Sequence, residues 1–489
     1  MAERSIINPS ITRTSLLIGA IALIVLSAAH GQNRVTALEL TGQFSEAQAL
    51  LRSMLDSART TPPAERHAWE FEIDRLDRIR NDYSLTEDQL FNQLQRSIAN
   101  VTREEMQRWM AEGKFDMRPI DGKLRFLGVS RSNLFWRYPD IAARRLRPSD
   151  DSAFEKAVWD ACVAIRTAAE TEQRPYVLPK HFRVTMTVTV DSNAVPAGAI
   201  VRAWLPIPRA YPFQRDFRMI TSSPAVKEIA PENSPIRSAY LEQPAVHGQP
   251  TRFTIEYSYT ADGICFVTDP HTVQPYDPED PVVRQYTAEA PHIVFTDTMR
   301  ALAAKIAGAE TNPLVKAQLF YNWIAEHIQY SYAREYSTIR NIGDYCLRKG
   351  YGDCGQEALL YLTLCRLSGI PARWQSAWFT FPGGKTIHDW TEIYVKPYGW
   401  MPVDPYMGIF AMQYLRSLSP EQRLAVRDFY FGGLDQYRIA ANSDHCRTLE
   451  PPKRSFRSDT VDFQRGELEY GDTNIYFDKY DYSLSITEE

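Results

Sequence analysis

Cys354 stands at the start of an apolar segment that could make it a nucleophile. From Gln356 to Leu367 the chain has no helix-breaking residue and is apolar on almost every face, and Gly369 and Pro371 follow. This pattern predicts a buried helix that begins near Cys354. Backbone N–H groups are unpaired in the first turn of a helix and the dipole is positive there, so we expect the thiolate to be favoured. A purely structural cysteine is expected inside the helix, where Cys365 lies.

A histidine and a carboxylate follow in a predicted hairpin. Residues 388–403 predict two strands rich in strand-forming side chains, joined by a turn at 396–399. Such a hairpin would place His388 and Asp404 within a residue or two of register. A thiolate needs a base of this kind, and the base needs a group that orients it. Asp389 competes for the carboxylate role, but adjacent strand residues point to opposite faces, so His388 and Asp389 should not both face the site.

These residues occur in the order of a known family. The ordered set resembles the core of the transglutaminase-like superfamily, a papain-related thiol fold that includes transglutaminases, peptide N-glycanases and bacterial hydrolases. The segments that carry the resemblance are Gly352-Asp353-Cys354, His388-Asp389-Trp390, Gly399-Trp400 and Val403-Asp404. The Cys, His and Asp are separated by 34 and 16 residues, whereas the Cys and His of papain itself lie roughly 130 or more residues apart. The resemblance covers about residues 297–410.

The resemblance implies a role for each matched residue. Cys354 would be the nucleophile, His388 the general base and acid, and Asp404 the group that orients the imidazole. The backbone N–H of Cys354 would contribute to the oxyanion hole. Trp390 and Trp400 either wall the substrate groove, as tryptophans of the family do, or pack the core of the barrel.

A triad of this kind attacks an amide and forms a thioester. We expect an acyl-transfer enzyme acting on a peptide, protein or glycoprotein substrate, with hydrolysis as the favoured outcome. Two alternatives stay open: a protein-crosslinking transglutaminase, and a non-enzymatic glycan- or protein-binding module on the same scaffold. No cofactor and no metal are expected, because the sequence has neither a CxxC pair nor an oxygen-rich calcium loop of the D-x-D-x-D-G kind.

The hydrophobic periodicity changes along the chain and predicts an α+β protein of several parts. Helical spacing dominates residues 32–177, an accessory domain in which we find no chemistry, and strand alternation dominates residues 178–268, a small β-sandwich. A Pro- and Asp-rich linker at 269–292 leads into the transglutaminase-like domain at 293–489, a buried helix with an N-terminal cysteine packed on an antiparallel sheet or barrel. The strand-like tail from Thr473 to Ile486 is expected to complete that barrel.

Composition and the N-terminus bound the class of protein. The chain has 489 residues, a net charge of −5, 44% hydrophobic and 24% charged residues, which excludes a disordered chain. No long Lys/Arg run is present, so nucleic-acid binding is not expected. Arg4, Arg13 and the apolar run Leu16 to Leu26 predict a signal peptide over residues 1–31, and hence a periplasmic or extracellular protein with no stable membrane span after cleavage. The alternative is an uncleaved N-terminal anchor.

Overall fold

The computed structural model describes residues 33–57 and 61–489 and divides the chain into two compact units, with the boundary after Arg131. The predicted signal peptide lies outside the described residues. Among the helices that are described, none is long and apolar enough to cross a membrane.

The first unit is mainly helical, as its periodicity predicts. Its elements are α2 (Phe44–Ser57), α3 (Pro63–Asp82), α4 (Glu87–Gln95), α5 (Arg103–Ala111) and the hairpin β1 (Met117–Ile120) and β2 (Lys123–Phe126). Thr86 begins α4 with a capping box in which Thr86 and Gln89 bond each other's backbone N–H. Buried apolar side chains of α2 and α3, Phe44 and Leu76 among them, pack into one cluster.

The second unit contains a β-sandwich whose strands come from two distant stretches of the chain. The earlier stretch gives β3 (Tyr176–Val190), β4 (Ile200–Pro206), β5 (Gln214–Ser223), β6 (Glu228–Ile229), β7 (Ser238–Pro244) and β8 (Thr251–Cys265). The later stretch gives β14 (Gly433–Leu434), β16 (Glu467–Tyr470), β17 (Thr473–Ile475) and β18 (Tyr480–Glu488). A short 3-10 helix, η3 (Phe477–Lys479), precedes β18. One sheet has the order β14-β8-β3-β18, with β5 also on β8, and the other has the order β17-β16-β4-β7-β6.

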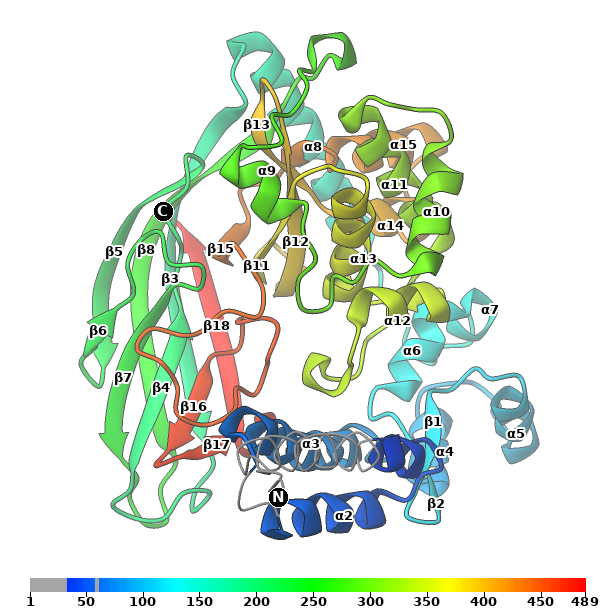
Figure 1. Cartoon of the computed structure of the whole chain (residues 1–489). Coiled ribbons are helices and arrows are strands. Elements are labelled where there is room, and N and C mark those ends of the chain that lie inside the picture. Colours follow the sequence, from blue (N-terminus) through cyan, green and yellow to red (C-terminus); the bar gives the residue numbers. More distant parts are fainter. Residues whose placement is uncertain (1–32, 58–60) are drawn as a thin grey trace, which may run out of the picture. The chain divides into compact units, whose positions relative to one another are not determined.

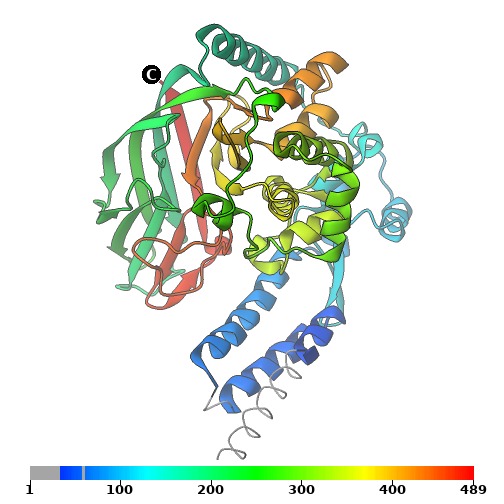
Figure 2. The same cartoon turned by 45° about the horizontal axis from the view of Figure 1, so that its top comes forward.

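This pairing corrects one expectation. The tail strands β17 and β18 join the sandwich instead of the barrel of the cysteine domain, because β18 pairs with β3 over its whole length and β16 pairs with β4. Figure 2 shows this tail strand among the earlier strands of the sandwich. The alternating buried side chains of β3 and β8 supply the shared interior, so the sandwich is built from both ends of the unit.

The remaining elements of this unit include a four-stranded antiparallel sheet of order β13-β12-β11-β15. Its strands are β11 (Ala372–Phe379), β12 (Thr386–Val395), β13 (Gly399–Val403) and β15 (Arg438–Asn442). The helices are α6 (Ser130–Arg137), α7 (Pro139–Ala142), α8 (Ser152–Glu172), α9 (Pro281–Tyr286), α10 (Asp297–Ala307), α11 (Pro313–His327), α12 (Ile342–Lys349), α13 (Cys354–Leu367), α14 (Pro405–Gln413) and α15 (Pro420–Phe429). Short pieces complete it: η1 (Pro270–Thr272), β9 (Gln329–Tyr330), η2 (Tyr336–Thr338) and β10 (Tyr351–Gly352).

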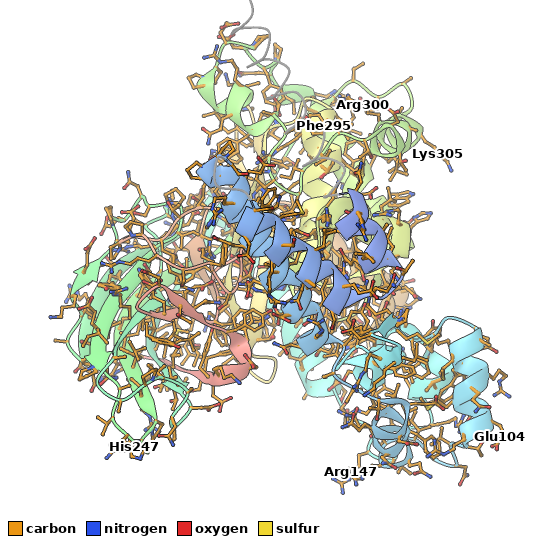
Figure 3. The ribbon with its side chains drawn as sticks, turned by 60° about the horizontal axis from the view of Figure 1, so that its bottom comes forward. Glu104, Arg147, His247, Phe295, Arg300 and Lys305 are labelled. Atoms are coloured by element: carbon orange, nitrogen blue, oxygen red, sulfur yellow. The ribbon has the colours of Figure 1, made fainter. Side chains whose placement is uncertain are left out.

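Helix α13 lies at the centre of this arrangement, between the sheet and the helices α10 to α12 (Figure 1). Every residue from Gly355 to Arg366 is buried, which the apolar sequence predicts because no face of the helix is left for solvent. The outer helices are amphipathic by contrast: Arg300 and Lys305 on α10 point away from the core (Figure 3). The fold therefore fixes the first turn of α13 inside the unit.

Candidate active site

The first turn of α13 places Cys354 beside a carboxylate. Asp353 caps the helix by accepting a hydrogen bond of 3.2 Å from the backbone N–H of Gln356. The Cys354 Sγ then lies 3.4 Å from the Asp389 Oδ2 and donates to it. Among the described residues, the thiol bonds Asp389 and makes no hydrogen bond to His388. All six cysteines are free thiols.

The electrostatics at the thiol differ from the sequence expectation. Burial raises the pKa of Cys354 well above its ordinary value, and the negative charges of Asp389 and Asp353 raise it further. The helix start was expected to favour the thiolate, and that expectation is wrong for this conformation, because desolvation and two carboxylates outweigh the positive end of the dipole. The thiol is therefore neutral in this state.

The hairpin brings His388 and Asp404 together. Strands β12 and β13 pair with Thr391 opposite Val403. Continuing this register places Asp404 opposite Trp390, two positions along β12 from His388. His388 Nε2 lies 2.8 Å from Asp404 Oδ2, and both side chains are buried. Burial lowers the pKa of His388, although the Asp404 charge opposes the shift. The histidine is thus neutral and held by its carboxylate.

Arg438 on β15 completes this group, and the sequence analysis missed it. Its Nη1 lies 2.9 Å from Asp404 Oδ2, and its Nη2 lies 3.0 Å from Asp435 Oδ2. Burial opposes ionisation of Asp404, but the electrostatic interactions with His388 and Arg438 and the hydrogen bond from His388 hold the pKa of Asp404 below its ordinary value. Asp404 is therefore ionised, and it also caps α14 by accepting from the backbone N–H of Met407 at 3.0 Å. Arg438 follows the motif by more than thirty residues and carries no spacing signal that could have identified it.

The two predicted tryptophans pack against other side chains. Trp390 is completely buried; its ring stacks on His388 with centroids 5.9 Å apart, and its Nε1 donates to Gln375 at 2.6 Å. In this conformation Trp390 packs against the imidazole, and its substrate-binding role stays a prediction. Trp400 packs under the guanidinium of Arg373, 4.0 Å from the ring centroid. A substrate-binding role for Trp400 stays a prediction.

Tyr406 is a second residue that sequence reasoning missed. Its ring lies 5.2 Å from the ring of His388 and 4.9 Å from that of Tyr330, measured between centroids. Burial raises the pKa of Tyr406 well above its ordinary value, and the charge of a Cys354 thiolate would raise it further, so the same ring is near both the imidazole and the thiol. Its place two residues after Asp404, in Asp-Pro-Tyr, is the signal that could have identified it.

Part of this site lies in a segment that matches a known family. Residues 300–405 match the model of the transglutaminase-like superfamily core. Over this segment the chain is similar to the transglutaminase-like core. The segment contains α13, the hairpin and Asp404, whereas Arg438 lies outside it. In the described part of the chain, no group of three or more His, Cys, Asp or Glu side chains could hold a metal ion.

Individual relatives of the transglutaminase-like core are distant. A Haemophilus influenzae protein, described as uncharacterized, is 24% identical over 197 residues, which are 34% of this chain and 52% of that protein. The chain thus spans about half the length of this curated relative. A crystal structure of a candidate cysteine protease from Cytophaga hutchinsonii is 18% identical with a TM-score of 0.41, covering 64% of this chain and 91% of its own. The periplasmic domain of TgpA from Pseudomonas aeruginosa is 14% identical with a TM-score of 0.26, covering 53% and 96%.

The buried cap of α13 gives a prediction about stability and pH. Burial raises the pKa of Asp353 to about 6, so the folded state binds more protons than the unfolded state between pH 4 and 6, and stability falls as the pH rises through that window. Asp353→Asn keeps a good cap but cannot ionise. Above pH 6 the wild type should lose up to about 2–3 kcal/mol of its free energy of unfolding, at 1.36 kcal/mol per pKa unit. We expect the variant to avoid this loss.

Chemical denaturation at pH 5 and pH 8 measures this effect. The free energy of unfolding of the wild type should fall between the two pH values more steeply than that of Asp353→Asn. The matched control is Asp140→Asn, at an exposed position in the same unit. Equal falls for wild type and Asp353→Asn would contradict the prediction.

Proposed function

We propose that this chain is an exported, cysteine-dependent acyl-transfer enzyme that attacks amide bonds, most often with water as the acceptor. Cys354 is its nucleophile, His388 its general base and acid, and Asp404 its orienting carboxylate. The observation that carries the proposal is the buried bond between His388 and Asp404, within a segment that matches the transglutaminase-like core. The export signal at residues 1–31 is part of the proposal.

The proton positions at His388 follow from the state of Asp404. An ionised carboxylate only accepts hydrogen bonds, so the proton between the two side chains is on His388 Nε2. The lone pair of the imidazole is then on Nδ1, and this is the atom that takes the thiol proton. The bond to Asp404 also stabilises the imidazolium that forms, which is the usual contribution of the third member of such a triad.

The reaction then proceeds in two balanced halves. The Cys354 thiol gives its proton to His388 Nδ1, and the sulfur attacks the amide carbonyl to form a C–S bond. The C–N bond breaks as the imidazolium gives its proton to the leaving amine, which leaves a thioester on Cys354. Water, deprotonated by His388, opens the thioester and restores the thiol, whereas an amine in its place would give a crosslink.

One observation favours the alternative of a non-enzymatic binding module. The thiol is neutral and bonds Asp389 rather than His388, which is the state expected of a scaffold that performs no chemistry. Catalysis therefore requires Cys354 to leave Asp389, and the experiment must show turnover that depends on the thiol.

Incubation of the full chain with a peptide and glycopeptide library tests the proposal. The wild type should convert side-chain amides to acids or cut the backbone, as read by mass, and Cys354→Ala should do neither. Products with an added amine would instead indicate crosslinking. Identical product patterns for both proteins would reject the enzyme. N-terminal sequencing of the protein recovered from its host should show cleavage near Gly31, and an intact N-terminus would reject cleavage of the signal.

A further inference from the structure

Asp389 on β12 is fixed against the thiol from several sides. Its Oδ2 accepts from Cys354 Sγ and also lies 3.2 Å from the hydroxyl of Tyr336. Its Oδ1 accepts from Gln464 Nε2 at 2.6 Å, and the same amide bonds the backbone carbonyl of His388 at 3.0 Å. Gln464 belongs to the stretch after the transglutaminase-like core. The position of Asp389 is thus set by groups that the triad does not require.

A second buried carboxylic acid, Asp462, faces Asp389. Its Oδ1 accepts from the hydroxyl of Ser376, from Asn442 Nδ2 at 3.1 Å, and from the backbone N–H of Phe463 at 2.6 Å. Ser376 is the register partner of Asp389 in the sheet. Asp462 Oδ2 is buried and accepts from no donor among the described residues. Two carboxyls in one dry site cannot both be ionised, so a single proton is shared between Asp389 and Asp462.

Asp389 also occupies the space at the start of α13. A Cβ placed on Gly355 would clash with the hydroxyl oxygen of Tyr336 and would lie 2.6 Å from Asp389 Oδ2. Those two oxygens therefore cover the first turn, where backbone N–H groups are unpaired and negative charge is stabilised. A substrate carbonyl oxygen needs the same place to accept from the backbone N–H of Cys354.

We propose that Asp389, paired with Asp462 through a shared proton, is a positioning residue that holds the Cys354 thiol neutral and away from His388 until substrate displaces it. The proposal deepens the proposed function and rests on it. When a substrate carbonyl takes the start of α13, the thiol leaves Asp389 and its proton passes to His388 Nδ1. The carboxyl pair keeps its own proton throughout, so the charge at the pair does not change.

Several other ionisable groups surround this pair and the thiol. Burial raises the pKa of Tyr330, Tyr336 and Tyr406 well above the ordinary value, and it raises that of Glu357 as well, so these side chains are neutral near pH 7. Asp353, whose burial raises its pKa to about 6, is ionised near pH 7. Asp459 accepts from the backbone N–H of Asp462 at 2.9 Å, and burial raises the pKa of Asp459 to about 6. Apart from Glu357, which the control below replaces, these groups are common to every variant.

Alkylation of Cys354 by iodoacetamide, followed on its own peptide by mass, tests the proposal across pH 5 to 10. In Asp389→Asn the remaining charge is confined to Asp462, further from the sulfur, so alkylation at pH 7 should be about tenfold faster, which is one pKa unit. In Asp462→Asn the charge is confined to Asp389 beside the sulfur, so alkylation should be about tenfold slower. The two substitutions remove the same carboxyl chemistry and are expected to act in opposite directions.

Glu357→Gln is the matched control, because it removes a buried carboxyl on α13 that carries no charge, and its alkylation rate should equal that of the wild type. Shifts of Asp389→Asn and Asp462→Asn in the same direction, or no shift, would overturn the proposal. The pH profile of the wild type alone also tests the proposal. Half-maximal alkylation is expected above the ordinary thiol pKa of about 8.5. A lower midpoint overturns the proposed role of Asp389 even if a variant fails to fold.

The fate of the proposed function is read separately. In the Asp389→Asn background the thiol is free to reach His388, so a further His388→Ala change should slow alkylation. If that change has no effect while the alkylation rates of the two carboxyl variants still shift in opposite directions, the proposed role of Asp389 stands. The catalytic pairing of Cys354 with His388 is then rejected. If His388→Ala slows alkylation but the carboxyl variants alkylate at the wild-type rate, the pairing of Cys354 with His388 stands and the proposed role of Asp389 is rejected.

Discussion

His388→Ala is expected to reduce amide turnover by at least about 10³-fold, because the variant lacks the imidazole that takes the thiol proton and returns it to the leaving amine. Asp404→Ala is expected to cost less and to leave measurable activity, since the imidazole remains and loses only its orientation and the stabilisation of its charge. The measurement is the initial rate on a substrate found in the library experiment, compared among the two variants and the wild type.

The matched control for this prediction is His327→Ala. His327 lies near the end of α11, is exposed, and stacks on Trp323 with ring centroids 4.7 Å apart. Its loss should leave the rate within the error of the assay. A rate for His388→Ala equal to that of the wild type would remove His388 from the mechanism, whatever its contact with Asp404.

Arg438→Met is expected to destabilise the second unit by about 3–5 kcal/mol, the usual cost of removing one partner from a buried ionic group. Arg438 is buried and forms ion pairs with the carboxylates of Asp404 and Asp435, and its guanidinium lies 4.5 Å from the ring centroid of Phe379. Methionine would keep the apolar contact but leave two buried carboxylates without their cation. Thermal and denaturant unfolding measure the loss.

Arg284→Met provides the comparison. Its ion pair with Glu279, 3.3 Å long, is formed by two largely exposed side chains, and such pairs contribute about 0–1 kcal/mol. An Arg438→Met protein as stable as Arg284→Met would show that the buried group holds less charge than the geometry indicates.

The parts of the site that were predictable depend on short-range patterns. The breaker-free apolar segment predicts α13 because periodicity reports burial directly, and the turn between two strand segments fixes the register of His388 and Asp404. Both inferences involve residues less than 20 apart. The catalytic roles of Cys354, His388 and Asp404 remain predictions that the experiments above address.

The contacts that were missed depend on packing between distant segments. Strand alternation predicts opposite faces of β12 for His388 and Asp389. The sequence does not say which of these faces meets the start of α13, and the thiol meets the Asp389 face. Asp462 and Arg438 reach the site from stretches that carry no motif. The destination of the tail strands was misjudged for the same reason, since an alternating strand fits any half-buried sheet.

The union of β3 with β18 has a consequence for biosynthesis. These strands meet along nine residue pairs, and the Lys180–Glu488 ion pair joins residues 308 positions apart. At a synthesis rate of roughly 5–20 residues per second, β3 leaves the ribosome some 15–60 s before its partner. During that interval β3 is an unpaired edge of its sandwich sheet, and unpaired edge strands can pair with other chains. The nascent protein is therefore exposed to aggregation at β3 until β18 has been synthesised.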